Sequence, residues 1–394
     1  MKKKPLISII IPVTRINLLD TCIQSLLNND ISNCEIILHF NNVIKSKKLI
    51  NKINLKLKNK SNNLKIIFNS KLLKIQKNWE KALSYHEGQW VMFLCEDDLI
   101  YTNSIKNLEL IIKKHKDCNC FFWDTNSYVY NHDKKILKIS KNTYDQKLKL
   151  KKFNSKEILR KIFKNKSIHN FKKELPFFPG TLIRSKIIKK TNGNFFFNEE
   201  PMWSSAFQIL NSEKAYIRVP FIVTIIGELT NSSSVRHSQL SLKSGKKTEA
   251  EKFIKNFSIN FKYCHEVFSD LDSDIFIKFN RFFGFEIIMQ SLVKFKKFRQ
   301  FNFKINKKKI LKEIYYEALG RNSEGFFFSY IYELMILRKK IDINLDLIYK
   351  ELRVLFLDRI IKFLLRDPHE RRYYTSFKNL DNLDISNVLK NIKK

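Results

Sequence analysis

The stretch "GQWVMFLCEDDLIY", residues 88–101, decides the fold class, because an apolar strand in it runs directly into three acids. Apolar residues fill positions 91–95, and Glu96, Asp97 and Asp98 follow without a spacer. Adjacent carboxylates repel one another, so their position at a strand end indicates a cation or a ligand that carries one. The contrast with the rest of the chain is large, since its formal net charge is +36.

Strand-like and helix-like segments alternate around this stretch over about the first 125 residues. The patterns predict strands at 6–13, 34–40, 64–69 and 89–95, and helices at 17–29, 76–86 and 104–115. Repeated βα units predict an α/β fold with a parallel sheet that has helices on both faces. Ligands of such sheets bind beyond the carboxyl ends of the strands, which is where Asp97 and Asp98 lie.

The later part of the chain changes character twice. We predict one strand at 120–130, a polar and mobile excursion at 131–175, a strand at 177–184, a helix at 185–193, a helix from Pro201 and a strand pair within 215–226. From about residue 250 only helical patterns remain, up to 344–365. We therefore predict a first domain at 1–240 and a basic, mainly α-helical C-terminal domain at 241–394.

Length and composition limit the classes of protein. The chain has 394 residues, of which 44% are hydrophobic, so it is long enough and apolar enough to fold. Its six cysteines form no CxxC pair, which favours a reduced protein of the cytoplasm. No segment reaches the roughly 20 apolar residues of a membrane span. The sequence therefore predicts a cytoplasmic location, or attachment to the inner face of a membrane at its surface only.

Three segments together resemble the nucleotide-binding half of the family-two glycosyltransferases of the GT-A fold. They are "PLISIIIPVTR", the "EIIL" strand and "NWEKALSYHEGQWVMFLCEDD", and the resemblance covers about residues 5–235. Its most specific element is the ordered series Pro12, Asn78, Ala82, Gly88 and Asp97-Asp98. The resemblance implies a GT-A type α/β fold, whose mixed, mostly parallel sheet is flanked by helices, and an inverting, hexosyltransferase-like enzyme of polysaccharide biosynthesis. It would move a sugar from a nucleoside-diphosphate donor, a UDP-sugar first, to a hydroxyl of a glycan or glycolipid.

The resemblance also implies a metal site for Mn²⁺ or Mg²⁺. Asp98 would be a metal ligand, Asp97 would contact the ribose or a metal-bound water, and His237 would complete the site. A divalent cation neutralises the charge that develops on a departing diphosphate. Cys95 and Glu96 depart from the family pattern, which leaves the metal geometry open. The simpler alternatives are an acidic N-cap for the helix that starts near residue 103 or 104, and a structural role for His237.

A catalytic base is needed to deprotonate the acceptor hydroxyl. The family has a short acidic motif after a glycine-containing turn, and "NGNFFFNEEPMW" matches it in order. Glu200 is the first choice for the base and Glu199 the second. The alternative is that both glutamates only favour the dipole of the helix that begins at Pro201.

The nucleotide-sugar pocket is expected to include other positions of the matching segments: Pro12, Thr14, Arg15, Asn41, Lys71 and Asn78, together with Asp97. Asn41 stands where the family usually has an acid, although an amide still hydrogen-bonds a base or hydroxyl. A strand-to-helix turn explains Thr14 and Arg15 equally well. Lys71 has a solvated surface charge as its alternative.

The basic tail supports a rival from another class. Aromatic and basic residues interleave in "FNRFFGFEIIMQSLVKFKKFRQFNFK", which is typical of helix packing, of a helix on an anionic membrane, or of single-stranded nucleic-acid binding, in that order of preference. The rival is a non-catalytic module that binds nucleic acid or anionic membrane through this tail. A compositional bias towards lysine explains the charge as well.

Overall fold

The structure is a computed structural model that describes residues 4–130, 136–140, 150–165, 169–197, 201–229, 288, 291–292 and 294–301. The chain divides into two compact units. The described residues up to 159 and from 173 to 229 belong to the first unit. Those at 160–165, 169–172 and 288–301 belong to the second.

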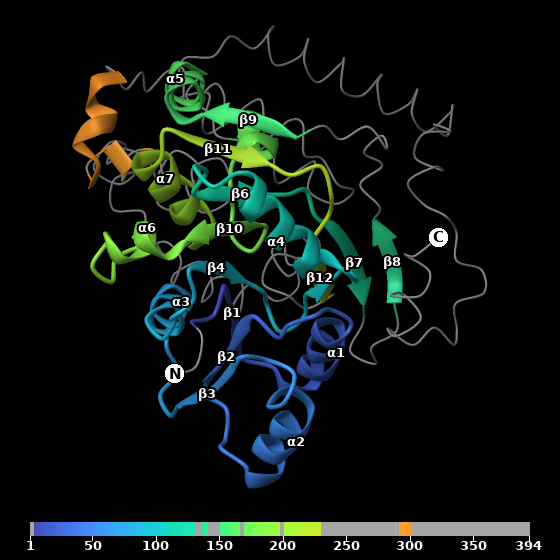
Figure 1. Ribbon diagram of the computed structural model, residues 1–394. Coiled ribbons are helices and arrows are strands. Elements are labelled where there is room, and N and C mark those ends of the chain that lie inside the picture. The colour runs from blue at the N-terminus through green and yellow to red at the C-terminus, as the bar shows by residue number, and fades with distance from the viewer. Residues whose placement is uncertain are drawn as a thin grey trace, which may run out of the picture. The chain divides into compact units, whose positions relative to one another are not determined.

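A sheet of eight strands forms the centre of the first unit (Figure 1). In spatial order the strands are β3 (Asn63–Asn69), β2 (Cys34–Asn41), β1 (Ile7–Val13), β4 (Trp90–Phe93), β10 (Thr181–Arg184), β6 (Cys120–Phe122), β11 (Ala215–Arg218) and β9 (Lys151–Asn154). Only β10 and β9 run against the other six. This is the mixed, mostly parallel sheet of a GT-A fold, as the family resemblance implies; the alternation of segments alone predicts a parallel sheet, without the antiparallel strands β10 and β9.

Helices cover both faces of this sheet (Figure 1). One face packs against α1 (Ile16–Leu27), α2 (Lys47–Leu57) and α4 (Ser104–Lys114), which share a single apolar core with alternate strand residues. The opposite face carries α3 (Ile75–Leu83), where Trp79 stacks on Phe93 of β4 at 5.0 Å. Because helices bury both faces, every residue of β1 and β2 is buried. Most of these residues are apolar, and the polar ones are Ser8, Glu35, His39 and Asn41.

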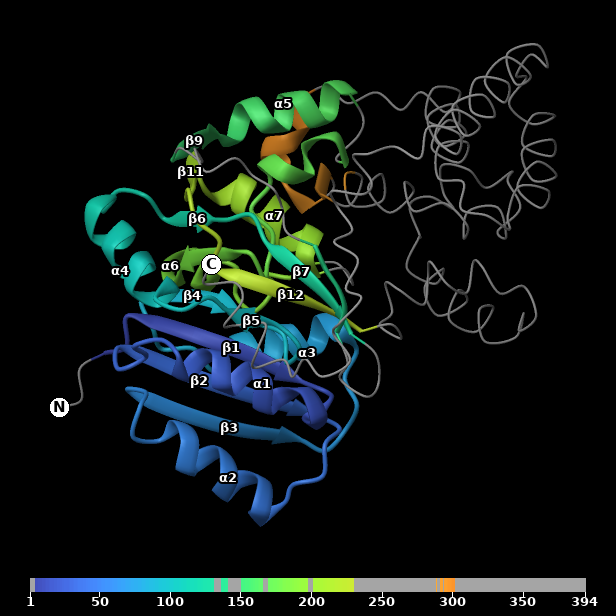
Figure 2. The same ribbon diagram turned by 90° about the vertical axis from the view of Figure 1, so that its right-hand side faces the viewer.

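A second sheet of four strands lies beside the end of β4 (Figure 2). Its order is β5 (Leu99–Ile100), β12 (Thr224–Leu229), β7 (Asn126–Tyr130) and β8 (Ile136–Ser140). β5 directly follows the three acids, and β12 pairs with it. The acids therefore lie in the short connection between the two sheets.

A buried carboxylate joins the starts of the central strands, at the edge of the sheet opposite the three acids. Glu35 of β2 is fully buried and accepts hydrogen bonds from the hydroxyl of Ser8 at 2.5 Å and the backbone N–H of Glu87 at 2.8 Å. Lys65 of β3 lies 2.8 Å from the same carboxylate and 2.7 Å from the exposed carboxylate of Glu87. One buried acid thus fixes the starts of β1 and β4 against β2 and β3.

Several predicted boundaries are wrong. The predicted strand 120–130 is two strands, β6 and β7, which belong to different sheets. The predicted strands 89–95 and 177–184 are shorter, because residues 94–98 and 177–180 are connections rather than strand. Helix α2 and the two-residue β5 were missed, the first because lysines surround its only buried residues, Ile53 and Leu57.

The excursion predicted at 131–175 contains regular structure in its described residues. These are β8, β9, α5 (Ser155–Asn165) and the 3₁₀ helix η1 (His169–Glu174). Pairing with β11 organises β9, and tertiary pairing of this kind leaves no strong local pattern.

In the second unit, the described residues include the 3₁₀ helix η2 (Lys296–Phe301), whose Phe298 packs edge-on against Phe163 at 5.8 Å. Apart from residues 288–301, the predicted helical domain lies outside the described residues. The boundary near residue 240 stays a prediction. No helix among the described residues is long and apolar enough to cross a membrane.

Candidate active site

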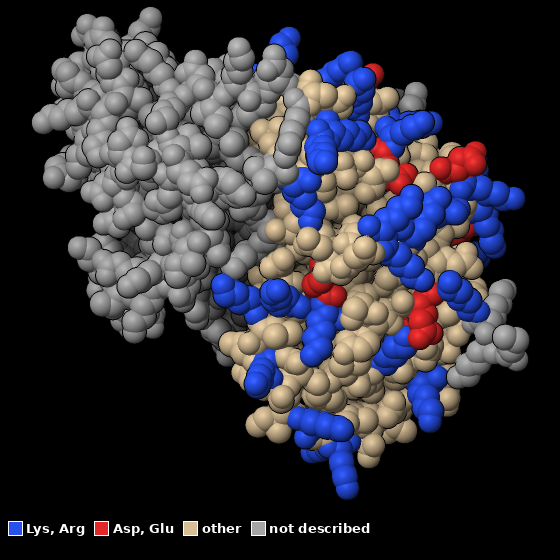
Figure 3. All heavy atoms as spheres, turned by 90° about the vertical axis from the view of Figure 1, so that its left-hand side faces the viewer, with Lys and Arg blue, Asp and Glu red and all other residues tan. Residues whose placement is uncertain are grey.

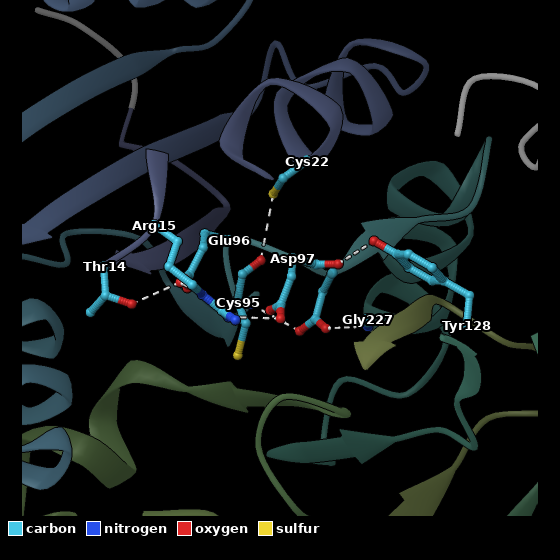
Figure 4. Close-up of polar contacts among 9 residues, drawn as sticks. Thr14, Arg15, Cys22, Cys95, Glu96, Asp97, Tyr128 and Gly227 are labelled. Carbon is cyan, nitrogen blue, oxygen red and sulfur yellow. Dashed lines mark hydrogen bonds and ion pairs between the residues drawn. The ribbon is translucent and has the colours of Figure 1, made fainter. Parts of the chain in front are cut away.

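The acidic motif, residues 95–98, lies at the carboxyl edge of the main sheet (Figure 4). Leu94 still bonds to the neighbouring strand, its N–H lying 3.0 Å from the carbonyl of Ile10. The chain then turns, with the N–H of Asp98 donating to the carbonyl of Cys95 at 3.1 Å. The motif therefore lies beside the end of β1 and the start of α1, which is the ligand-binding edge of such a sheet.

Three carboxylates are buried together in this motif. Glu96, Asp97 and Asp98 are only 5%, 7% and 1% exposed. Arg15 contacts two of them, with Nε 2.9 Å from Glu96 Oε1 and Nη2 2.7 Å from Asp97 Oδ2. The hydroxyl of Thr14 donates to the same oxygen of Glu96 at 2.8 Å. One guanidinium thus balances part of the charge of three acids.

Asp98 is held by backbone N–H groups from two directions. Cys95 donates to Oδ2 at 2.9 Å, and Gly227 of β12 donates to Oδ1 at 3.1 Å. The hydroxyl of Tyr128 on β7 donates to the backbone carbonyl of Asp97 at 2.6 Å (Figure 4). The second sheet therefore fixes the shape of the motif.

Burial changes the ionisation of both aspartates. Burial and the neighbouring Glu96 raise the pKa of Asp97 to about 6, although Arg15 opposes the shift. Burial and the adjacent Asp97 raise the pKa of Asp98 to about 7, against the two backbone N–H donors. A cation bound beside Asp97 and Asp98 would lower these raised pKa values, because it favours the charged form of both carboxylates.

The residues of the motif fit a divalent cation. Donor atoms of Cys95, Asp97 and Asp98 lie within 4.8 Å of one another, and this is the only such group among the described residues. Carboxylate oxygens are the ligands that Mg²⁺ and Mn²⁺ prefer. The alternative of an acidic helix cap is wrong, because α4 begins at Ser104 and its N-cap residue is Asn103.

The other residues expected in the pocket lie along the same edge of the sheet and differ in burial and in their contacts. Pro12 is buried within β1, and Lys71 is exposed after β3. Asn41, at the end of β2, exchanges two hydrogen bonds of 2.9 Å with the backbone of Leu73. Its amide therefore holds the chain that leads into α3.

Asn78 lies on the inner side of α3. Its Oδ1 is 2.8 Å from Nδ1 of His39, and both side chains are buried. The contact joins α3 to β2 near the carboxyl edge of the sheet.

The expected catalytic and metal residues Glu199, Glu200 and His237 lie outside the described residues. The chain before the two glutamates is described, and α3 holds it. Glu80 accepts the N–H groups of Phe195 and Phe196 at 3.2 and 2.8 Å. Helix α7 (Pro201–Ser212) begins directly after the glutamates, as predicted.

Sequence reasoning missed three residues of the site: Tyr128, Gly227 and Glu80. A signal existed for Gly227, because an isolated glycine inside a strand pattern often marks a close backbone approach. No local signal marks Tyr128 or Glu80, since their partners are 31 residues and more than 110 residues away.

A mostly parallel GT-A sheet with a buried acidic motif at its carboxyl edge indicates the glycosyltransferase class of proteins. Residues 8–181 match the family model "Glycosyl transferase family 2". This segment therefore belongs to that family and is a glycosyltransferase domain. The family and the enzyme class predicted from the sequence are confirmed.

Solved structures of S. aureus TarS are similar in fold at 13–14% identity. For TarS itself the TM-score is 0.40, and the match covers 60% of this chain but 38% of that chain. For TarS 1-349 in complex with UDP-GlcNAc it is 0.45, covering 79% and 80%. For the complex of TarS 1-349 with UDP it is 0.41, covering 78% and 77%. None of the curated protein sequences compared with this chain matches it.

Proposed function

We propose that this enzyme transfers a hexosyl group, with inversion, from a nucleoside-diphosphate donor to a hydroxyl of a glycan or lipid-linked glycan. A UDP-sugar is the first choice of donor. The observation that carries the proposal is the group of three buried carboxylates, two of them in contact with one arginine, in the segment that matches the family. A cytoplasmic location, at or away from the inner face of the membrane, stays a prediction.

Asp97 and Asp98 would hold Mn²⁺ or Mg²⁺, with His237 as a further candidate ligand. When bound, such an ion neutralises the charge that develops on the leaving diphosphate. Arg15 is the cation that the chain itself supplies at this place, and its planar guanidinium suits phosphate oxygens. Thr14, which follows β1 beside it, orients Glu96 through its hydroxyl.

Glu200 is the proposed base, with Glu199 as the second candidate. Inversion requires a carboxylate that takes the proton of the acceptor hydroxyl while the sugar–phosphate bond breaks. Support comes from the described neighbours, because Glu80 holds Phe195 and Phe196 immediately before the acids and α7 begins immediately after them. If Glu200 is the base, Glu200→Gln removes transfer but leaves donor binding unchanged. If Glu199 is the base, Glu199→Gln has that effect instead.

The net charge of +36 supports a second candidate function, the binding of a polyanion such as nucleic acid or anionic membrane. Figure 3 shows lysine and arginine side chains in several separate groups on one face of the described residues, with a smaller number of acids among them. Phosphate-driven binding falls steeply with salt. A filter-binding titration with RNA and DNA at 50 and 200 mM salt therefore tests this candidate.

Thermal unfolding with Mn²⁺ and a panel of nucleoside diphosphates tests the main proposal. A ligand at a hundred times its dissociation constant adds about 2.7 kcal/mol to the stability of the domain that binds it. We expect one nucleotide to give a metal-dependent shift that Asp98→Ala removes. Asp20→Ala is the matched control, because Asp20 is a surface acid paired with Lys52 and Lys56. Absence of any shift in the parent protein would contradict the proposal.

A further inference from the structure

Arg15 already occupies the position of a cation in the acidic motif. Its guanidinium spans two acids, with Nε at Glu96 and Nη2 at Asp97, and both carboxylates are less than 10% exposed. Arg15 itself is partly exposed, with 34% of its side chain accessible. A guanidinium is always charged, so this pairing is present over the whole working pH range.

A divalent ion and this guanidinium need the same oxygens. Asp97 is a candidate metal ligand, and its Oδ2 is the oxygen that Arg15 contacts at 2.7 Å. A divalent ion and a guanidinium that contact the same carboxylate repel one another strongly in a partly buried site. An ion that takes Asp97 therefore weakens the contact of Arg15 or displaces it.

The position of Arg15 in the chain places its side chain near the expected nucleotide, which could bind the displaced guanidinium. Arg15 is the N-cap residue of α1, in the connection after β1, and its side chain makes no cap hydrogen bond. This connection lies at the carboxyl edge where a nucleotide is expected. A planar guanidinium binds phosphate oxygens in pairs as well as it binds carboxylates.

We propose that Arg15 is the resident counter-cation of the acidic motif, that a divalent ion competes with it for Asp97, and that the donor diphosphate receives the displaced guanidinium. The proposal rests on the metal-assisted function proposed above. Its consequence is that the metal binds tightly only together with the nucleoside diphosphate. Because binding free energies are reciprocal, the nucleotide also binds tightly only with the metal.

The test measures Mn²⁺ affinity directly, by the electron paramagnetic resonance signal of free Mn²⁺, with the full chain and with UDP as the probe. Without UDP, we expect Arg15→Gln to bind Mn²⁺ about ten- to hundredfold more tightly than the parent, the range for one charged hydrogen-bonded contact. UDP should tighten Mn²⁺ binding in the parent and tighten it less in Arg15→Gln. Arg15→Lys, which keeps the charge, should resemble the parent.

Arg184→Gln is the matched control, because it removes an arginine whose Nη2 donates to the carbonyl of Lys116 at 2.8 Å, away from the motif. It should leave Mn²⁺ affinity unchanged. Thermal unfolding of each variant confirms that it is folded. If Arg15→Gln is unfolded, Mn²⁺ binding by the parent with and without UDP carries the test, because the inference requires UDP to tighten it.

Two results would overturn the inference: equal or weaker Mn²⁺ binding by Arg15→Gln, or Mn²⁺ affinity in the parent that UDP does not change. Failure of the proposed metal-assisted function looks different. In that case neither the parent nor Arg15→Gln binds Mn²⁺, with or without UDP.

Discussion

Gly227 lies against the backbone carbonyl of Asp97, so closely that a Cβ atom on the glycine would be 2.2 Å from the carbonyl oxygen. The same added atom would be 3.0 Å from the hydroxyl of Tyr128, which donates to that carbonyl. The N–H of Gly227 in turn donates to Asp98. Strand β12 therefore touches the acidic motif backbone to backbone, and only glycine permits the approach.

Gly227→Ala should destabilise the first unit by about 3 kcal/mol, because the clash is with backbone and cannot be relieved by a side-chain rotation. Urea unfolding measures the change through the midpoint. Gly193→Ala is the control: Gly193 has φ +74° but nothing within 4 Å of an added Cβ, so only backbone strain of about 1 kcal/mol is expected. Equal losses in the two variants would show that the contact with Asp97 does not constrain the strand.

The stability of the metal-free protein should fall as pH rises from 5 to 8. The pKa of Asp98 in the folded state is about 7, above its ordinary value of 3.8, so the folded state keeps a proton that the unfolded state has released. Stability falls with pH wherever the folded state binds more protons. Asp97, with a pKa of about 6, adds to the lower part of this range.

Urea unfolding in EDTA at pH 5, 6, 7 and 8 tests this pH dependence. Asp98→Asn should flatten the slope, because an amide does not titrate. Asp20→Asn should leave the slope unchanged, because contacts with Lys52 and Lys56 lower the pKa of Asp20, which therefore titrates below this range. Parallel slopes in the parent and Asp98→Asn would contradict the raised pKa of Asp98.

Glu35→Gln should destabilise the fold by about 3 kcal/mol. The change leaves Lys65 with one fewer carboxylate and weakens the bonds from Ser8 and Glu87 to a fully buried group. Glu87→Gln is the control, because its side chain is 59% exposed and its ion pair with the same lysine should contribute less than about 1 kcal/mol. Equal midpoints of urea unfolding in the two variants would argue against a special role for the buried acid.

Glu80→Ala should lower kcat about ten- to hundredfold while leaving the KM for the donor unchanged. The two N–H bonds from Phe195 and Phe196 are lost, so the chain that leads to the proposed base is no longer held against α3. Glu80→Gln keeps an acceptor oxygen and should restore part of the rate. Steady-state kinetics with varied donor and acceptor separate the two constants.

Glu109→Ala is the control for Glu80→Ala. Among the contacts described, the carboxylate of Glu109 accepts one exposed hydrogen bond of 3.2 Å, from the side-chain amide of Asn33. The kcat of the Glu109→Ala variant should equal that of the parent. A change in the KM for the donor, with kcat unchanged in Glu80→Ala, would place Glu80 in the donor pocket instead of in the support of the acceptor side.

Sequence patterns predicted the first half of the sheet well, because β1 to β4, α1 and α3 follow local periodicity, although α2 was missed. β1 and β2 are buried on both faces and are mostly apolar, and α1 and α3 have clear helical spacing. The second half was predicted less well. β9 is organised by its pairing with β11, and the change of sheet between β6 and β7 occurs within one apolar run.

By itself, the sequence determined the four strands β1 to β4, the helices α1, α3 and α4, the place of the acidic motif at a strand end and the family of the enzyme. The strands and helices follow from periodicity and spacing, which are properties of neighbouring residues, and the family follows from the resemblance of three segments. Only the tertiary structure decided that Arg15 pairs with Glu96 and Asp97, that Gly227 closes on Asp97 and that Glu80 holds Phe195 and Phe196. Those partners are more than 80 residues apart in the chain, and no local pattern encodes which distant groups a sheet edge brings together.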